Sequence, residues 1–359
     1  MKNNNLTILA IETSCDDTCI SLTKGLDVLS SVVSSQTKIH QKYGGVYPFL
    51  AKREHQKNLP IVFKKALKKA GNSKIDLIAV TVGPGLEPCL WTGINFAKDL
   101  SQKLKIPIIP INHIEAHIIA NFIDLNSKIL FPAICLIVSG GHTQLILMQN
   151  FGKYKIIGET RDDAAGECFD KTARILGLGY PGGPAIAEQA RQWKSQITNN
   201  KFQKNPKSKI QNSKLNIELP RPMIHQKNYD FSFSGLKTAV LYKVKNLKLK
   251  IKDEKFIQTI SFEIQQAIID VLIYKTLKAA KDYKAKTIIL GGGVSANTEL
   301  RKQFKLKIEN GKLKINFFAP SKNLCLDNAA MVGITAHFNL LKNKIKSAKE
   351  IKADPNLRI

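Results

Sequence analysis

Residues 6–22 read LTILAIETSCDDTCISL, two apolar runs separated by a short polar turn. The runs, Leu6 to Ile11 and the one that ends at Leu22, are rich in the aliphatic and β-branched residues that favour strands. The turn, Glu12 to Thr18, carries hydroxyl and carboxylate groups beside backbone N–H groups, and such a turn can bind a phosphate or a metal. We therefore predict a β-hairpin whose tip is a candidate ligand-binding turn.

The same pattern occurs again in the middle of the chain. Ala133 to Val138 is an apolar run, the small polar residues Ser139 to Thr143 follow it, and Gln144 to Met148 is a second apolar run. The chain therefore holds two hairpins of one design, each with a turn of the size that accommodates a phosphate.

Glycines follow a buried-type strand in each half of the sequence. Gly83-Pro84-Gly85 comes after the run that starts at Asp76, and Gly291-Gly292-Gly293 comes after Thr287 to Leu290. Together with the repeated hairpins, this internal similarity indicates two related α/β domains. We expect the two domains to face one another across a cleft.

His113 to His117 reads HIEAH, with two histidines four residues apart. On a helix this spacing places both imidazoles on one face, where they can bind one ion. Glu115 lies off that face, so the glutamate of a zinc-protease H-E-x-x-H motif has no counterpart here. Taken alone, the motif also fits two surface histidines on an amphipathic helix. Asp327, at the start of the last predicted helix, offers the hard oxygen ligand that two imidazoles need, and such a set leaves coordination positions for substrate.

The loop at 291–297, GGGVSAN, leads from a strand into a helix. Glycines at that place let a phosphate or a planar ligand approach the backbone, and Asn297 is able to bond a base or a ribose. A purely structural turn explains the loop equally well. No Walker A or G-x-G-x-x-G motif occurs in the sequence.

The chain of 359 residues is 43% hydrophobic and carries a net charge of +27. Its first residues are polar and its longest apolar run, Ile129 to Val138, is too short to span a bilayer, so we expect a cytoplasmic protein without membrane contact. The six cysteines form no C-x-x-C pair, which favours reduced thiols over disulfides or a cysteine zinc site.

Three lysine-rich stretches, at 194–216, 243–255 and 301–314, carry more than half of the net charge. Such stretches attract a polyanion such as RNA. The stretches have similar amino-acid sequences, for example KSKIQNSKLNI and KLKIENGKLKI. This similarity also fits sequence drift toward low complexity on solvated surfaces. Both interpretations remain open from the residues alone.

Nine motifs occur in order along the chain and together are far more specific than any one of them. They are IETSCDD at 11–17, GPG at 83–85, HIEAH at 113–117, VSGGHTQL at 138–145, DDAAGECFDKTA at 162–173, YPGGP at 180–184, FSFSGLKT at 231–238, GGGVSAN at 291–297 and DNAAM at 327–331. The set resembles the TsaD/YgjD family of tRNA adenosine threonylcarbamoyltransferases, and the histidine in VSGGHT resembles its bacterial branch.

The resemblance implies an α/β fold of two actin-like domains (the ASKHA, ribonuclease H-like type) that face each other across a central cleft. We expect the first domain at residues 1–112, completed by a C-terminal helix at about 325–345. The second is then expected at 113–324, with a lysine-rich insertion at about 194–216.

The resemblance also implies the reaction and its residues. A threonylcarbamoyl group would pass from threonylcarbamoyl-AMP to the exocyclic amine of the adenosine 3′-adjacent to the anticodon, in tRNAs that read codons starting with A. His113, His117 and Asp327 would hold one Fe²⁺ per subunit, or Zn²⁺. The residues expected to bind the donor are Ile137, Val138, Ser139, Gly140, Gly141, Asp170, Gly183 and Asn297. Asp16 and Asp17 are the candidate proton acceptors.

By the same resemblance, the chain would work with a scaffold paralogue of the TsaB kind and a small ATPase of the TsaE kind. A separate synthase would supply the adenylate. The alternatives are an ATP-dependent sugar kinase or ATPase of the same fold, and a non-catalytic scaffold paralogue. Neither gives a role to the set formed by His113, His117 and Asp327.

Two positions depart from the family pattern. The opening motif usually ends in Asp-Glu, whereas Asp17 provides a shorter carboxylate here. Four residues beyond Gly183, where an acid often contacts the substrate, the chain has Ala187, and Glu188 comes one position later. The contact expected at that position is therefore in question.

Overall fold

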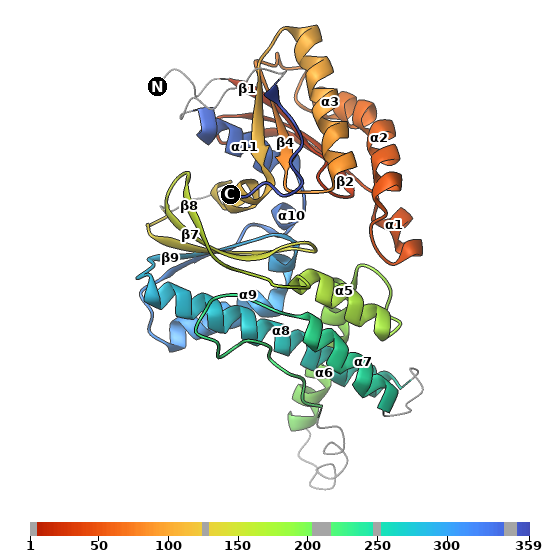
Figure 1. Cartoon of the computed structure of the whole chain (residues 1–359), viewed down its shortest axis with the longest axis vertical. Helices are drawn as coiled ribbons and strands as arrows, with labels where there is room; N and C mark the ends of the chain where they lie inside the picture. Colours follow the sequence, from red (N-terminus) through yellow and green to blue (C-terminus); the bar gives the residue numbers. More distant parts are fainter. Residues whose placement is uncertain (1–5, 124–128, 203–216, 247–252, 341–349) are drawn as a thin grey trace. The chain divides into compact units, whose positions relative to one another are not determined.

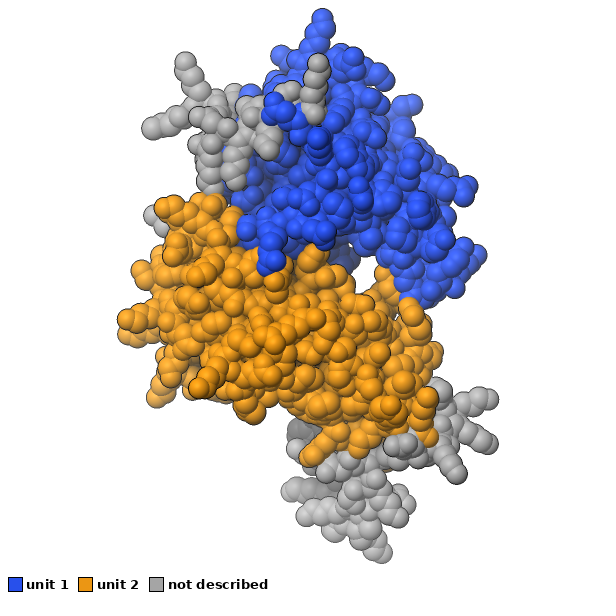
Figure 2. All heavy atoms as spheres, viewed as in Figure 1, with its two compact units in different colours: residues 1–128, 289–292, 318–359 blue, residues 129–288, 293–317 orange. Residues whose placement is uncertain are grey.

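The computed structural model describes residues 6–123, 129–202, 217–246, 253–340 and 350–359 (Figure 1). The chain divides into two compact units (Figure 2): unit 1 is Met1–Lys128, Ile289–Gly292 and Phe318–Ile359, and unit 2 is Ile129–Ile288 and Gly293–Phe317. The first division falls after Lys128, whereas the sequence led us to expect it after residue 112. The reason is that the helix carrying His113 packs against the sheet and the last long helix of unit 1.

A five-stranded sheet lies at the centre of unit 1, in the order β3-β2-β1-β4-β5. Strands β1, β2 and β3 pair antiparallel, and β4 and β5 continue the sheet parallel to β1. Both central strands, β1 and β4, are buried along their whole length, as expected for a sheet covered on both faces. The strands are β1 (Thr7–Glu12), β2 (Asp17–Lys24), β3 (Asp27–Ser35), β4 (Leu77–Gly83) and β5 (Ile108–Asn112).

Helices cover the two faces of this sheet with separate hydrophobic cores. One core joins the strands to α2 and α3, and the other joins them to α4 and α11. Helix α2 begins at Pro48, because proline suits the first turn of a helix. The helices of unit 1 are α1 (Thr37–His40), η1 (Gln41–Tyr43), α2 (Pro48–Lys69), α3 (Glu87–Leu104), α4 (His113–Ile119), η2 (Ala120–Phe122), α10 (Lys322–Cys325) and α11 (Ala329–Leu340).

The second sheet repeats the connectivity of the first. Its order is β10-β9-β6-β7-β8, so its three successive strands β6, β7 and β8 correspond to β1, β2 and β3, and β9 and β10 correspond to β4 and β5. The two predicted hairpins are present as β1–β2 and β6–β7, both antiparallel. The strands are β6 (Ala133–Val138), β7 (Thr143–Asn150), β8 (Lys153–Glu159), β9 (Thr287–Gly291) and β10 (Asn316–Phe318).

Helix α8 is the longest helix of unit 2 and packs against α6, α5, α9 and β6. Among the described residues it is the one helix long and apolar enough to cross a membrane, but 78% of its most apolar window is buried inside the protein. That burial is typical of a core helix. The helices of unit 2 are α5 (Ala165–Ile175), α6 (Gly182–Phe202), α7 (Ser234–Asn246), α8 (Glu254–Asp282), η4 (Gly293–Ala296) and α9 (Thr298–Asn310).

Candidate metal centre

Helix α4 starts at the end of β5, and Asn112 fixes its first turn. The Asn112 Oδ1 atom accepts hydrogen bonds from the backbone N–H groups of Ile114 (2.8 Å) and Glu115 (3.1 Å). This N-cap satisfies two of the donors that a helix start leaves without partners. It also determines where the helix begins, so that His113 is its first residue and His117 lies one turn later on the same face.

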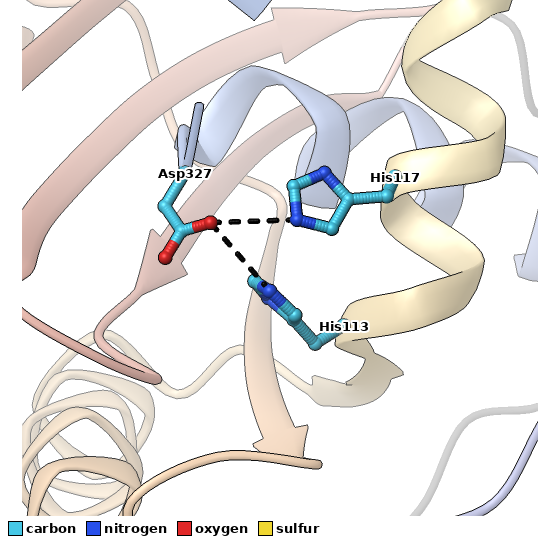
Figure 3. A group of neighbouring side chains, drawn as sticks. All are labelled: His113, His117 and Asp327. Carbon is cyan, nitrogen blue, oxygen red and sulfur yellow. Dashed lines mark ion pairs between the residues drawn. The ribbon is translucent and has the colours of Figure 1, made fainter. Parts of the chain in front are cut away.

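His113, His117 and Asp327 converge within unit 1 (Figure 3). The Oδ1 atom of Asp327 lies 3.6 Å from Nε2 of His113 and 3.4 Å from Nε2 of His117. The two imidazole rings are nearly perpendicular, at 79°, with centroids 4.5 Å apart. The spacing of the histidines and the position of Asp327 before α11 therefore bring together the three residues that the sequence indicated.

The donor atoms fit a single divalent ion. Ligand atoms about 2.1 Å from one ion at tetrahedral angles lie roughly 3.4 Å apart, and the three atoms here all lie within 4.8 Å of one another. Both ring nitrogens of His117 are buried: among the described residues Nδ1 has no hydrogen-bond partner, and the contact of Nε2 is the 3.4 Å ion pair with Asp327. A buried nitrogen without a partner is costly unless a ligand occupies it. The set of two imidazoles and one carboxylate suits iron(II) or zinc.

Glu12, the last residue of β1, lies directly behind His113. Its Oε2 atom is 3.0 Å from Nδ1 of His113, and Ser14 Oγ is 3.2 Å from the same nitrogen. The carboxylate is fully buried and also accepts hydrogen bonds from the Thr81 hydroxyl (2.6 Å) and the Ser14 N–H (2.5 Å). A carboxylate that accepts from one imidazole nitrogen leaves the other nitrogen to the metal and orients the ring.

The electrostatics of this pair match such a role. Burial by itself lowers the pKa of His113, but the charges of Glu12 and Asp327 outweigh burial and raise the pKa to about 9. Burial favours a higher pKa for Glu12, yet the neighbouring His113 holds the pKa below its ordinary value. Burial lowers the pKa of His117, and the charge of His113 lowers it further. The site thus binds positive charge, and a metal ion would take the place of the proton on Nε2 of His113.

Asp16 and Asp17, the candidate proton acceptors, lie at the tip of the first hairpin. Burial raises the pKa of both carboxyls. For Asp17 the pKa reaches about 7, because the charges of Asp327, Asp16 and Glu12 add to burial and outweigh a hydrogen bond from Ser35. A carboxylate with a pKa near neutrality is well matched to accepting a proton at physiological pH.

The turn between β6 and β7 leaves both of its glycines uncovered. A Cβ atom placed at Gly140 or Gly141 would meet no atom within 4 Å. The carbonyl oxygen of Ser139 accepts a hydrogen bond from the N–H of Gly166 at 3.2 Å, so the start of α5 lies beside this turn. The turn can present the N–H groups of Gly140 and Gly141 to phosphate oxygens, whereas the N–H groups of Ala165 and Gly166 at the start of α5 already donate to Thr143 and Ser139. Ile137 and Val138 are almost fully buried in β6 as whole residues, so a ligand would reach their backbone only at the end of the strand, beside Ser139.

Asp170 and Gly183 lie together in unit 2. The Oδ1 atom of Asp170 accepts a hydrogen bond from the N–H of Gly182 at 2.7 Å, which holds the glycine-rich turn against α5. A Cβ at Gly182 would lie only 2.6 Å from Cα of Asp170, whereas a Cβ at Gly183 would meet nothing within 4 Å. Gly183 is therefore the open member of the pair.

The side chain of Asn297 is engaged in the protein itself. Its Oδ1 atom accepts from the Leu300 N–H at 3.0 Å and caps α9, and its Nδ2 atom donates to Oε1 of Gln265 at 2.8 Å. These bonds use one of the two N–H donors on Nδ2 and one of the two lone pairs on Oδ1, which leaves the others for a base or a ribose. The sequence pattern could not distinguish a capping asparagine from a ligand-binding one.

A pocket of about 210 Å³ lies in unit 2, between α6, α8 and the start of α9. Ala187, which stands where the family often has an acid, lines this pocket. Glu188, one position later, and Gln265 line it as well. The Glu188 carboxylate accepts hydrogen bonds from Arg191 (2.7 and 2.9 Å) and Gln192 (2.9 Å). Glu188, the acid one position after Ala187, is thus bonded to residues of its own helix, α6.

Comparison with known proteins decides the family. Residues 27–334 match the family model of TsaD, tRNA N6-adenosine threonylcarbamoyltransferase. The chain belongs to this family. A relative of that name from Thermosipho africanus is 46% identical over 98% of this chain and 99% of its own length, and one from Syntrophomonas wolfei is 44% identical over 98% and 97%. A third, from Clostridium perfringens, is 43% identical over 99% of both.

Solved structures with distant sequences support the actin-like fold. A full-length HypF in its phosphate- and nucleotide-bound form is 12% identical, with a TM-score of 0.58 over 97% of this chain and 57% of that one. HypF of T. kodakarensis is also 12% identical, with a TM-score of 0.54 over 95% of this chain and 48% of that one. This chain therefore spans about half the length of the HypF chains that it matches, and the likeness concerns the fold alone.

Glu12 is the site residue whose role the sequence did not reveal. The sequence pattern puts it in the polar turn, whereas the structure places it at the end of β1 and against His113, a candidate metal ligand. One signal was available: a glutamate that directly continues an apolar strand is rarely buried without a partner. That signal points to Glu12 but does not identify His113 as its partner.

Proposed function

We propose that this chain transfers the threonylcarbamoyl group from threonylcarbamoyl-AMP to the exocyclic amine of the adenosine 3′-adjacent to the anticodon, in tRNAs that read codons starting with A. The observation that carries the proposal is the convergence of His113, His117 and Asp327, with Glu12 behind His113, in a chain of the TsaD family.

In this reaction the amine nitrogen attacks the carbamoyl carbon. A carbon–nitrogen bond forms, the bond from that carbon to the phosphate oxygen breaks, AMP leaves, and the amine loses one proton. The protein has to place the two reactants, to hold the charge that develops on the leaving phosphate, and to take up the proton.

His113, His117 and Asp327 would hold one iron or zinc ion. When bound, such an ion acts as a Lewis acid for the phosphate and carbamoyl oxygens of the donor. Glu12 would keep Nδ1 of His113 protonated, so that its Nε2 atom faces the ion. Fe²⁺ is the metal that the family resemblance favours, with Zn²⁺ as the alternative.

The open turn at Ser139, Gly140 and Gly141 would bind the donor's phosphate through the backbone N–H groups of Gly140 and Gly141, because the Ser139 N–H already donates to the carbonyl oxygen of His142 at 2.8 Å. The backbone of Ile137 and Val138, together with Asp170, Gly183 and Asn297, would bind the remainder of the donor. Asp17 would accept the amine proton, because its pKa of about 7 suits transfer near neutral pH. Asp16 is the second candidate for that role.

We further propose that the chain acts in the cytoplasm and with helper proteins. By family resemblance these are a scaffold paralogue of the TsaB kind and a small ATPase of the TsaE kind, while a separate synthase supplies the adenylate. The kinase and scaffold alternatives are not favoured, because the named relatives that cover nearly the whole chain are threonylcarbamoyltransferases.

The test is direct transfer. The purified chain is incubated with threonylcarbamoyl-AMP, the helper proteins and an unmodified tRNA that reads an A-starting codon, and the digested nucleosides are analysed by mass spectrometry. We expect a threonylcarbamoyl adduct on one adenosine. A matched tRNA with inosine at that position, which lacks the amine, should give none.

The His117→Ala and Asp327→Ala proteins should form the adduct at least about a hundredfold more slowly, because a metal ligand is lost. If the wild-type chain formed no adduct but hydrolysed ATP when sugars were supplied, the kinase alternative would replace this proposal.

A further inference from the structure

Three aromatic side chains are strongly exposed on unit 1: Tyr43, Tyr47 and Phe49, with exposed fractions of 62%, 54% and 67%. Phe49 and Tyr43 are the most exposed large apolar side chains among the residues that the structure describes. The rings of Tyr43 and Tyr47 stack, with centroids 5.9 Å apart and planes at 26°. Neighbouring exposed apolar groups mark an interaction site. We call these three residues the 43–49 aromatic surface.

Basic residues flank this surface in the sequence. Between residues 37 and 57 the chain has five basic residues, Lys38, Lys42, Lys52, Arg53 and Lys57, and a single acid, Glu54. Lys42 directly precedes Tyr43, and Arg53 lies four residues after Phe49 on α2, which places the side chains of Phe49 and Arg53 on one face of that helix. Aromatic rings beside cations form the combination that binds unpaired bases together with their phosphates.

Buried hydrogen bonds hold the backbone of this segment in place. The N–H of Tyr47 donates to Nδ1 of His40 at 3.2 Å, and Nε2 of His40 lies 3.1 Å from Oε1 of Gln36. The Nε2 atom of Gln36 in turn donates to the carbonyl oxygen of Ala51 at 3.3 Å. His40 and Gln36 are almost fully buried, so the aromatic rings project from a fixed support. A fixed support lowers the entropy that binding costs.

The same network reaches the first hairpin. His55 is fully buried, and its Nδ1 atom lies 2.8 Å from the Thr18 hydroxyl and 3.4 Å from Nε2 of Gln36. Its Nε2 atom lies 3.0 Å from the carbonyl oxygen of Cys15, the residue before Asp16. The 43–49 aromatic surface is therefore connected through buried polar groups to the hairpin that bears the candidate proton acceptors.

We infer that the 43–49 aromatic surface stacks against unpaired bases of an RNA loop, while Lys42 and Arg53 contact its phosphates. This inference rests on the proposed function, according to which the RNA is the anticodon loop of the tRNA substrate. The excess of positive charge favours RNA over a protein partner, because unpaired nucleotides offer both phosphates for the cations and flat bases for the rings.

The test uses the full chain and a labelled anticodon stem-loop RNA, beside the same RNA with abasic loop positions. In the Tyr43→Ala/Tyr47→Ala/Phe49→Ala protein, we expect affinity for the intact loop to fall about tenfold or more, as for the loss of one stacked base. Affinity for the abasic loop should hardly change. Tyr242→Ala is the matched control, because Tyr242 is 59% exposed on α7 and outside this surface.

Two further variants separate stacking from charge and from misfolding. Tyr43→Phe/Tyr47→Phe keeps both rings and should bind the intact loop like the wild type. Lys42→Gln/Arg53→Gln should weaken binding of both RNAs and lower the slope of log affinity against log salt by about 0.7 for each phosphate that is no longer neutralised.

An equal loss of affinity for the intact and abasic loops, or no loss for either, would overturn the inference. It would also fall if the triple alanine protein kept its RNA affinity and lost only the binding of a helper protein. Threonylcarbamoyl transfer, measured separately, tells the two proposals apart. If transfer is absent but loop binding still depends on the aromatic rings, only the proposed function is contradicted. If transfer is normal but loop binding does not depend on the rings, only this inference is contradicted.

Discussion

At the scale of single residues, the contact between Glu12 and His113 determines which imidazole nitrogen faces the metal position. The carboxylate is fully buried and lies 3.0 Å from Nδ1. A buried carboxylate at this place stabilises the protonated Nδ1, and through it the orientation of the ring.

Glu12→Gln should therefore weaken metal binding without unfolding the chain. Glutamine keeps the shape and an acceptor oxygen but removes the negative charge, and loss of such a partner typically lowers metal affinity about ten- to a hundredfold. Titration of the metal-free protein with Fe²⁺ or Zn²⁺ measures the change, with Glu54→Gln on the surface of α2 as the control. Unaltered affinity in Glu12→Gln would show that His113 needs no such support.

Asp17→Asn should change how stability depends on pH. In the folded chain, burial and the neighbouring negative charges raise the pKa of Asp17 to about 7, whereas in the unfolded chain the pKa is about 3.9. The stabilising contribution is therefore fully present below about pH 4 and is lost as pH rises through 7. Relative to the Asn variant, the metal-free wild type should lose stability between about pH 4 and pH 7 in denaturant unfolding. A constant difference between the two proteins would mean that the folded chain does not hold this proton.

The convergence of His113 and His117 could be predicted from the sequence because a helix has a fixed period. His113 and His117 lie four residues apart, and a helix brings that spacing to one face whatever surrounds it. The neighbours of Asn297 could not be predicted in this way. Its bonds to Leu300 and Gln265 depend on how α9 packs against α8, and tertiary packing leaves no local pattern.

At the scale of elements, the hairpins β1–β2 and β6–β7 were predictable because apolar strands around a short polar turn have few other solutions. Strands β3 and β8, at the edges of their sheets, were not predicted. Several residues of each are exposed, so their sequences lack the continuous apolar run that marks a buried strand. The first unit also extends further than the expected first domain, since the packing of α4 on unit 1 depends on contacts distant in sequence.

Asn112→Ala should loosen the start of α4. The substitution removes the cap that binds the N–H groups of Ile114 and Glu115, and loss of such a cap costs about 1 kcal/mol of stability. Because His113 is the first residue of the helix, metal affinity should fall as well. Denaturant unfolding and metal titration measure the two effects. Asn112→Asp keeps the acceptor and should restore both, and an Ala variant equal to the wild type in both would contradict the role of the cap.

Gly166→Ala should disturb the turn between β6 and β7. A Cβ at this position would lie 2.4 Å from the carbonyl oxygen of Ser139 and 2.9 Å from Cα of Gly140. Relief of that overlap costs about 1–3 kcal/mol and displaces the turn, so both stability and donor binding should decrease. Gly235→Ala on α7 is the control, because its Cβ would meet nothing within 4 Å. If both variants behaved alike in denaturant unfolding, close packing at Gly166 would be irrelevant.

At the scale of the whole molecule, the net charge of +27 should make RNA binding strongly dependent on salt. Much of the charge lies in the stretches at 194–216 and 243–255, of which residues 203–216 and 247–252 fall outside the described residues. On α9, the side chains of Lys302, Lys305 and Lys307 are exposed. Contact between the lysine-rich stretches and tRNA thus stays a prediction from the sequence.

Neutralising the lysines of 201–214 should lower the salt dependence of tRNA binding. For a duplex, each phosphate that the protein no longer neutralises reduces the slope of log affinity against log salt by about 0.9. The measurement compares the glutamine-substituted chain with the wild type over a series of salt concentrations. An unchanged slope would assign these lysines to low-complexity drift on a solvated surface.

The most direct test of the central proposal is a titration of metal-free protein with Fe²⁺, in which the rate of adduct formation on tRNA is measured in the presence of threonylcarbamoyl-AMP and the helper proteins. We expect the rate to rise from near zero and to level off at about one equivalent per chain, as a single site formed by His113, His117 and Asp327 requires. The same titration of Asp327→Ala should show no rise at that ratio. A metal-free chain that transfers the group at full rate would contradict the proposal.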